Sequence, residues 1–474
     1  MTPRLIDLGA TELARLISAG EVSSRAVVEA HLARIEDVNS AIGAVTVPLR
    51  ESALASADAC DRARLRAQAP LGPFHGVPFT VKENIDCLGS ATTHGAPILR
   101  DARPQDDAPI VARLKAAGGI PLARTNMSEM GLRLCTWNPL RGRTLNPHDP
   151  RLTVGGSSGG DAAAVATGMA PLGLGNDLGG SLRIPAHCCG VAALKPTTGR
   201  VPHVATLAPR DHGLAGQLML ADGALARRVA DLRVALSVLA GRDVRDPRSV
   251  DAPLVGAAPL ARRATLVTTL PGGPFDDESG TAVAAIRRAG AALRAAGWEI
   301  VEVEPPELQK VNDLFGKVLG ADMAVAMAGL QPFVSPELAG HVRRLCHAAA
   351  LDEMTPYEVH TERSRLGRAW SSFFVDHPVA IGPTWGRPVW PIDSDLYAVH
   401  GVELLQATVR FTTPGNLLGF PSVALPMGLE AGLPTSVQIY ADSWREDLCL
   451  EAAEIIERAA PRVVPVDPGS GKVR

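Results

Sequence analysis

Residues 155–160 read Gly-Gly-Ser-Ser-Gly-Gly, and residues 175–185 read Gly-Asn-Asp-Leu-Gly-Gly-Ser-Leu-Arg-Ile-Pro. The whole region 154–200 is dense in Gly, Ala, Ser and Pro and has very few long side chains. Such a composition lets backbone approach backbone, or a bound ligand, closely. A glycine-rich loop with serines is by itself usually only a loop, so the rest of the chain must decide whether these two carry chemistry.

The flanking sequence alternates between helical and strand patterns. Residues 76–82, Gly-Val-Pro-Phe-Thr-Val-Lys, predict a short buried strand that ends at Lys82. A helix that closes near residue 117 precedes a strand at 120–123, and an Ala- and Arg-rich helix at 282–296 precedes a strand at 298–303. This alternation indicates a layered α/β fold.

The composition excludes several classes of protein. The chain has 474 residues with a net charge of −3, which leaves no electrostatic footprint for a nucleic acid or an anionic membrane surface. No run of about 20 apolar residues predicts a membrane span, and no signal peptide is evident, so we expect a cytoplasmic protein. The seven cysteines include no C-x-x-C pair, which argues against a disulfide framework and a zinc ribbon. The histidines lack metal-ligand spacing, and no nucleotide-binding glycine motif occurs.

Several segments together resemble the amidase signature family, the serine hydrolases with a Ser–cis-Ser–Lys triad. Besides the two glycine-rich loops, the resemblance is carried by residues 76–86, 125–129, 190–200, 416–421 and 432–438. It extends from about residue 7 to 460 and is weakest between about 203 and 400. The family often has Thr where this chain has Asn176 and Leu178, but backbone N–H donation survives both changes.

The resemblance implies that Ser181 is the nucleophile, Ser157 the bridging serine and Lys82 the base. Chemistry agrees, because a serine hydroxyl is a poor nucleophile until a neighbour removes its proton. A lysine can do so only when neutral, so burial must lower its pKa from about 10.4 towards 7–8. The alternative for Lys82 is a plain ion pair with Glu83 or Asp86.

The run before the candidate nucleophile fits an oxyanion hole. Backbone N–H groups can converge on one oxygen where glycines permit unusual backbone angles, and the candidate donors are Leu178, Gly179, Gly180 and Ser181.

Three further residues are candidates for supporting roles around these loops. Asp177 and Arg183 are expected to pair and hold the nucleophile loop, while the alternative for Arg183 is contact with a substrate carboxylate. Ser158 is either a supporting hydrogen-bond donor or a helix cap.

The expected fold is an α/β/α sandwich around a large mixed, mostly parallel twisted β-sheet. We expect one domain over residues 1–474, with a catalytic core at about 70–205 and 405–460 and a variable substrate-pocket region at about 206–404. Gly131 and its neighbours are candidates for substrate binding. The segment 310–400 adds apolar side chains that are either pocket lining or core, namely Met323, Met327, Phe333, Trp370, Phe373, Phe374, Trp385 and Trp390.

The expected activity is hydrolysis of an amide C–N bond through a serine acyl-enzyme, without a metal or organic cofactor. The favoured substrate is a small apolar or aryl amide, and the same chemistry extends to carbamates and esters. A homodimer is compatible with this chain, whose oligomeric state the sequence leaves open.

Three other functions stay in competition. A glutaminase subunit of a tRNA-dependent amidotransferase is disfavoured by the apolar Ile184 after Arg183. An α/β-hydrolase reading uses the G-x-S-x-G pattern at 155–159 but leaves Lys82 unexplained. A catalytically silent binding subunit usually lacks a triad residue, whereas all three are present here.

Overall fold

The strands of this computed structural model form one large sheet and a small hairpin. The structure describes residues 4–66, 70–207, 211–270, 280–349 and 354–468. In spatial order the eleven strands of the large sheet are β1 (Val45–Pro48), β3 (Ile120–Thr125), β2 (Pro78–Lys82), β6 (Leu172–Asp177), β8 (Ala221–Ala226), β7 (Ala192–Lys195), β12 (Ser422–Glu430), β13 (Leu433–Tyr440), β11 (Val379–Pro383), β9 (Arg263–Leu266) and β10 (Glu299–Glu302). The hairpin joins β4 (Trp137–Asn138) to β5 (Gly142–Arg143).

The sheet is mixed, as the sequence predicted. Its parallel pairs form two blocks, β3–β2–β6 and β11–β9–β10. Antiparallel pairs connect the blocks through β8, β7, β12 and β13, and β1 is antiparallel to β3 at the edge. Parallel pairing is therefore less extensive than expected, because the alternation of helix and strand does not reveal which strands become spatial neighbours.

Helices cover both faces of the sheet, which confirms the α/β/α sandwich. Side chains alternate along each strand, so Leu225 of β8 enters one core and its neighbours Ala224 and Ala226 enter the other. The first core packs against α2 (Ser24–Ile42), α3 (Arg50–Arg66), α5 (Gly159–Ala166) and α6 (Arg183–Cys189). The second packs against α1 (Ala10–Ala19), α4 (Pro109–Ala116), α8 (Val229–Leu239), α9 (Thr281–Ala295) and α15 (Glu446–Ala459).

The strands and the helix that the sequence predicted by range are present. Strands β2, β3 and β10 and helix α9 fall within a few residues of the predicted ranges.

No helix in the described part of the chain combines the length and apolar character that a membrane crossing requires.

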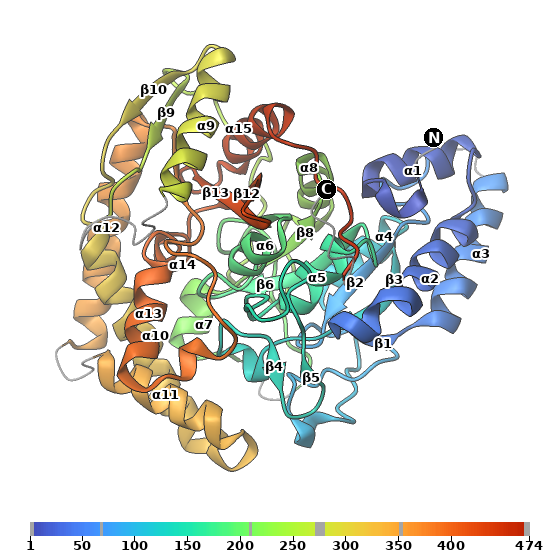
Figure 1. Cartoon of the computed structure of the whole chain (residues 1–474), viewed down its shortest axis with the longest axis horizontal. Coiled ribbons are helices and arrows are strands. Elements are labelled where there is room, and N and C mark those ends of the chain that lie inside the picture. Colours follow the sequence, from blue (N-terminus) through green and yellow to red (C-terminus); the bar gives the residue numbers. More distant parts are fainter. Residues whose placement is uncertain (1–3, 67–69, 208–210, 271–279, 350–353, 469–474) are drawn as a thin grey trace.

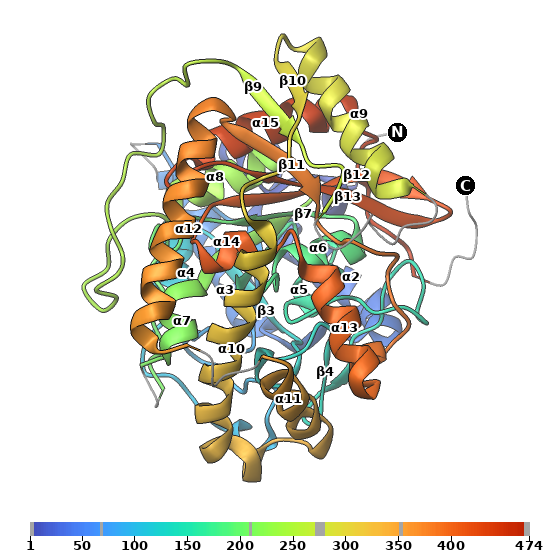
Figure 2. The same cartoon turned by 90° about the vertical axis from the view of Figure 1, so that its left-hand side faces the viewer.

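Helices from the expected substrate-pocket region, about 206–404, gather at one end of the molecule. They are α7 (Leu214–Met219), α10 (Leu308–Leu330), α11 (Pro336–Ala348), α12 (Pro356–Asp376) and most of α13 (Ala398–Val409), and the short α14 (Thr413–Leu417) follows from the expected core. Figure 1 shows α10–α13 on the side opposite the N-terminal helices α1–α3, and Figure 2 views this side directly. Phe315 of α10 reaches back to the loop that contains Ser181, where its ring lies 3.1 Å from the position of a Cβ added to Gly179.

Candidate active site

Lys82 ends β2 with its side chain fully buried. Its Nζ lies 2.7 Å from Oγ of Ser157 and 2.8 Å from Oδ1 of Asn176. Burial lowers the pKa of Lys82 to about 7, against the opposing attraction of Asp161, Asp177 and Asp222.

The alternative ion pairs of Lys82 are absent from this structure. The Glu83 carboxylate instead binds Arg141, Thr46 and Thr93, all within the described residues. The Asp86 carboxylate accepts both the N–H and the hydroxyl of Thr206, at 2.6 and 2.7 Å. The contacts of Lys82 therefore favour the prediction that it is a desolvated base over the alternative of an ion-paired lysine.

Ser157 follows a cis peptide bond from Gly156. A Cβ added to Gly156 would lie 2.4 Å from the carbonyl oxygen of Arg133, so only glycine fits there. The N–H of Ser128 donates to the Ser157 carbonyl at 3.2 Å. These contacts hold the hydroxyl of Ser157 against Lys82.

Ser158 links the two glycine-rich loops. Its N–H donates to the carbonyl oxygen of Ser181 at 3.2 Å, and its hydroxyl donates to the carbonyl oxygen of Asn176 at 3.4 Å. Although Ser158 occupies the N-cap position of α5, its side chain makes no capping hydrogen bond. The geometry thus agrees with a supporting role rather than a cap.

Ser181 lies between β6 and α6 and is 8% exposed. It borders a cavity of about 590 Å³, which Leu178, Gly179 and Gly131 also line. Gly131 lies beside Ser157, since a Cβ added to Gly131 would lie 3.6 Å from Oγ of Ser157. Ser181 and Gly131 therefore border the cavity, and Ser157, which contacts Lys82, lies directly behind Gly131.

One of the four expected oxyanion donors has another partner. The N–H of Gly180 donates to Oδ1 of Asp177 at 2.7 Å, contrary to the expectation that it faces a substrate oxygen. Within the described residues, the N–H groups of Leu178, Gly179 and Ser181 have no hydrogen-bond acceptor. These three residues line the cavity, whereas Gly180 does not.

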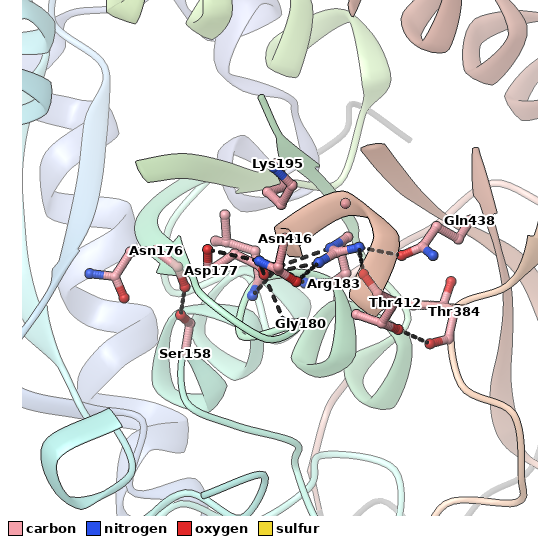
Figure 3. A network of polar contacts seen from close by, with 12 residues as sticks. Ser158, Asn176, Asp177, Gly180, Arg183, Lys195, Thr384, Thr412, Asn416 and Gln438 are labelled. Carbon is pink, nitrogen blue, oxygen red and sulfur yellow. Dashed lines mark hydrogen bonds and ion pairs between the residues drawn. The ribbon is translucent and has the colours of Figure 1, made fainter. Parts of the chain in front are cut away.

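Asp177 and Arg183 form a buried ion pair, with Nε of Arg183 3.0 Å from Oδ2 of Asp177 (Figure 3). Burial opposes ionisation of Asp177, but the guanidinium of Arg183 holds the pKa of the carboxyl well below its usual range. The remaining guanidinium hydrogen bonds go to Asn416, Thr412 O, Gln438 and Tyr440.

Arg183 has no exposed surface, and its hydrogen bonds all go to protein groups. The alternative that it contacts a substrate carboxylate is therefore not supported by its position.

Sequence reasoning missed the polar residues that surround this site. Asn176 appeared only as a departure from the family pattern, yet it is the second partner of the Lys82 amine. Asn416 donates to both the carbonyl and the carboxylate of Asp177. Asn416 and Gln438 lie in segments that carried the family resemblance, which was the available signal.

The pocket wall differs from the expectation for most apolar residues of 310–400. Met323 lines the cavity, together with residues the sequence did not single out, namely Phe315, Gly316, Leu319, Leu405 and Val409. Phe333 is exposed, and Met327 packs beside Met323 in a small cluster. The others belong to the core: Trp370 and Phe374 pack with Phe420, and the partly buried Phe373 packs against both of them. Trp385 packs with Trp390 and His187.

One group of residues in the described chain has metal-ligand geometry, namely Cys135, Asp393 and Asp395. Arg133 pairs with both carboxylates, at 2.7 and 2.8 Å, and Arg143 pairs with Asp393 at 2.6 Å. The arginines already neutralise these acids, so the group is explained as an ion-pair cluster.

Sequence comparisons relate the chain to amide-hydrolysing enzymes over most of its length. The model of the amidase family matches residues 26–450. An indoleacetamide hydrolase of Bradyrhizobium diazoefficiens is 40% identical over 455 residues, covering 95% of this chain and 86% of the relative. A 6-aminohexanoate-cyclic-dimer hydrolase of Paenarthrobacter ureafaciens is 32% identical over 484 residues, covering 96% of this chain and 95% of the relative.

Solved structures agree with the sequence comparisons. A 6-aminohexanoate cyclic dimer hydrolase complexed with substrate superposes with a TM-score of 0.83 at 28% identity, covering 98% of this chain and 99% of that one. The match of the family model across most of the chain, together with these relatives, shows that the chain belongs to the amidase signature family and is an amide-hydrolysing enzyme.

Proposed function

We propose that this enzyme hydrolyses small apolar or aryl amides through an acyl-enzyme on Ser181. The observation that carries the proposal is the contact between the fully buried amine of Lys82 and the hydroxyl of Ser157, 2.7 Å apart beside the cavity that Ser181 borders. A neutral amine in this position can accept a proton that a charged lysine could not.

The proton path follows from the partners of Lys82. One N–H of the neutral amine donates to Oδ1 of Asn176, so the lone pair is free to accept the hydroxyl proton of Ser157. Ser157 in turn takes the proton of Ser181 as Ser181 attacks the amide carbon. The same path then returns a proton to the leaving amine, and water hydrolyses the ester by the reverse route.

The developing oxyanion needs donors that already point at the cavity. We assign this role to the backbone N–H groups of Leu178, Gly179 and Ser181, because no described residue accepts from them. Fixed donors of this kind require no reorganisation as the charge forms.

The cavity supports an acyl group with an apolar body. Leu132, Leu134, Phe315, Leu319 and Met323 line it, and polar residues of α10 and α13 such as Asp313 and Glu403 border it as well. A volume of about 590 Å³ is within the range of small-molecule sites. The indoleacetamide hydrolase relative favours arylacetamides as the first substrates, and aryl carbamates and esters share the acyl chemistry.

A serine-directed phosphonyl fluoride tests the nucleophile. We expect one adduct, located on Ser181 by peptide mass spectrometry and absent from the Ser181→Ala variant. An adduct on Ser157 would support the α/β-hydrolase reading, and no adduct on the folded protein would support a silent scaffold.

A substrate panel tests the substrate class. Indoleacetamide, phenylacetamide, an aryl carbamate, an aryl ester, acetamide and glutamine are compared at equal concentration. We expect the aryl substrates to have the highest kcat/KM. A preference for glutamine would favour the amidotransferase reading instead.

We also propose a cytoplasmic enzyme that works without a metal. All seven cysteines are free thiols, as expected in a reducing compartment. Dialysis against EDTA is expected to leave turnover unchanged, and loss of activity that Zn²⁺ restores would contradict this.

A further inference from the structure

A chain of charged and polar side chains lies beside the Lys82 amine and has no part in the proton path. Nδ1 of His203 lies 2.9 Å from Oδ1 of Asp222, and Nε2 of His203 lies 2.9 Å from Nε2 of His212. Asp222 is 1% exposed and the His203 side chain is 10% exposed. A buried carboxylate and imidazole can alter the charge of a neighbouring amine, so their position relative to Lys82 matters.

The sheet places the Asp222–His203–His212 group next to the Lys82 amine. Asn176 of β6 and Asp222 of β8 are direct partners in an antiparallel ladder. Side chains of directly opposed residues share a face, with their Cβ atoms about 4.5–5.5 Å apart. Because Oδ1 of Asn176 is 2.8 Å from Nζ of Lys82, the Asp222 carboxylate lies close to the amine and attracts its charged form.

Other charged groups also act on Lys82. Asp177 is paired with Arg183. The Asp161 carboxylate, which accepts the hydroxyl of Thr80 at 2.9 Å, attracts the charged amine, and burial raises its pKa to about 7, so it titrates in the same range as Lys82 and is common to the wild type and every variant. Burial also lowers the pKa of His94 to about 4, which leaves that imidazole neutral.

The surroundings of His203 favour its cationic form. Burial opposes the charge, but the Asp222 carboxylate raises the pKa of His203 above its usual value. The Asp246 carboxylate accepts the backbone N–H of His203 and pairs with Arg248. Burial and the nearby His203 lower the pKa of His212 to about 4, so neutral His212 can accept the second imidazole proton.

We propose that Asp222 and His203 are positioning residues that set the charge state of Lys82: Asp222 favours the ammonium, and cationic His203 offsets it. The proposal rests on the assignment of Lys82 as the base. Neither Asp222 nor His203 lines the cavity that Ser181 borders, so we expect both to act through the amine.

The two residues have opposite effects on the pH at which Lys82 becomes neutral. Asp222→Asn removes a negative charge and keeps an oxygen that can accept from His203, so the amine loses its proton at lower pH. His203→Gln leaves the Asp222 charge without its partner, so the amine keeps its proton to higher pH. An opposite charge within a few ångströms shifts a pKa by about 1–3 units, and partial neutralisation gives about 1.

The experiment measures kcat/KM between pH 5 and 9 on the best neutral amide from the substrate panel. We expect the acidic limb to move down by about 1 pH unit in Asp222→Asn and up by about 1 unit in His203→Gln. The double variant should follow Asp222→Asn, because His203 acts through Asp222. His31→Gln removes a buried histidine of α2 whose Nδ1 bonds the Val27 carbonyl of the same helix. The acidic limb of this variant should lie at the same pH as that of the wild type.

The rate of phosphonyl fluoride labelling against pH gives an independent readout that avoids substrate binding. Limbs that stay in place in both single variants, or that move in the same direction, overturn the inference. Asp222→Asn preserves shape and hydrogen bonding, so it decides the case alone if His203→Gln does not fold.

Lys82→Met separates this inference from the proposed function. If Lys82→Met retains the wild-type activity and acidic limb, both the proposed function and the inference fail. If Lys82→Met is inactive while neither single variant moves the limb, only the inference fails.

Discussion

The carboxylate of Asp177 accepts the backbone N–H of Gly180 at 2.7 Å and so fixes the turn that precedes Ser181. Gly180 has φ +105°, and a Cβ there would lie 2.6 Å from Cδ1 of Ile184 and 2.8 Å from Cγ2 of Thr412. We therefore expect Gly180→Ala to distort the neighbouring donors and to lower kcat by about 100- to 1000-fold, as the loss of an oxyanion contact does.

Gly297→Ala is the matched control. Gly297 also has a positive φ, +86°, but it follows helix α9, does not line the cavity, and a Cβ added there meets nothing within 4 Å. Steady-state kinetics should show a reduction of kcat below about 10-fold. Equal losses in both variants would mean that the turn does not position the oxyanion donors.

The two buried lysines offer a second matched pair. Lys82 and Lys195 are both fully buried, and burial lowers the pKa of each to about 7. Only Lys82 contacts Ser157, whereas Nζ of Lys195 donates to the carbonyl oxygen of Pro196 at 2.8 Å. Because a general base contributes about 100- to 10,000-fold, Lys82→Met should lose at least about 100-fold more turnover than Lys195→Met. Comparable activity in the two variants would contradict the role of Lys82.

The pH dependence of the wild type follows from the same burial. Lys82 acts only when neutral, and its pKa is lowered to about 7. On a neutral amide, kcat/KM should rise about tenfold per pH unit below pH 7 and level off above it. A profile that stays flat down to pH 5.5, or that keeps rising beyond pH 9, would contradict a neutral lysine base.

Much of the candidate site could be predicted from the sequence, because each candidate residue lies within one short segment. Lys82 ends a strand, while Ser157 and Ser181 lie in short glycine-rich loops, so three short segments are enough to identify them as candidates. The partners that hold these loops come from elsewhere. Gln438 of β13 and Asn416 of α14, the helix just before β12, reach Arg183 because β12 and β13 follow β7 in the sheet. No spacing in the sequence encodes that strand order.

The pocket wall was harder to predict for a different reason. Helices α10 and α12 carry apolar residues on more than one face, and composition cannot say which face meets the cavity. Trp370 of α12 packs into the sheet core, whereas Phe315 of α10 turns to Gly179 and the cavity. The sequence also could not predict the direction of the Gly180 N–H, because that direction depends on the position of its acceptor, the Asp177 carboxylate.

Arg183 should contribute to stability and loop position, with no role in recognising charge. Arg183→Lys keeps the charge but loses the planar fork that binds Asp177, Asn416 and Thr412 O. Unsatisfied buried partners cost about 1–3 kcal/mol each, so we expect a lower unfolding temperature and lower kcat. KM should change equally for phenylacetamide and for an analogue with a distal carboxylate. A selective loss for the anionic substrate would instead mean that Arg183 contacts the substrate.

Gly316 of α10 should set the size of the acyl pocket. It lines the cavity, and a Cβ added there meets nothing within 4 Å. Gly329 on the same helix has equally open surroundings but is exposed and does not line the cavity. Leucine raises helix propensity at both positions by about 0.8 kcal/mol, so neither variant should lose stability. Gly316→Leu should raise KM for indoleacetamide at least about tenfold relative to acetamide, because its side chain fills the space a ring would occupy. Gly329→Leu should leave KM unchanged for both amides. Equal changes in KM in the two variants would place the acyl pocket elsewhere.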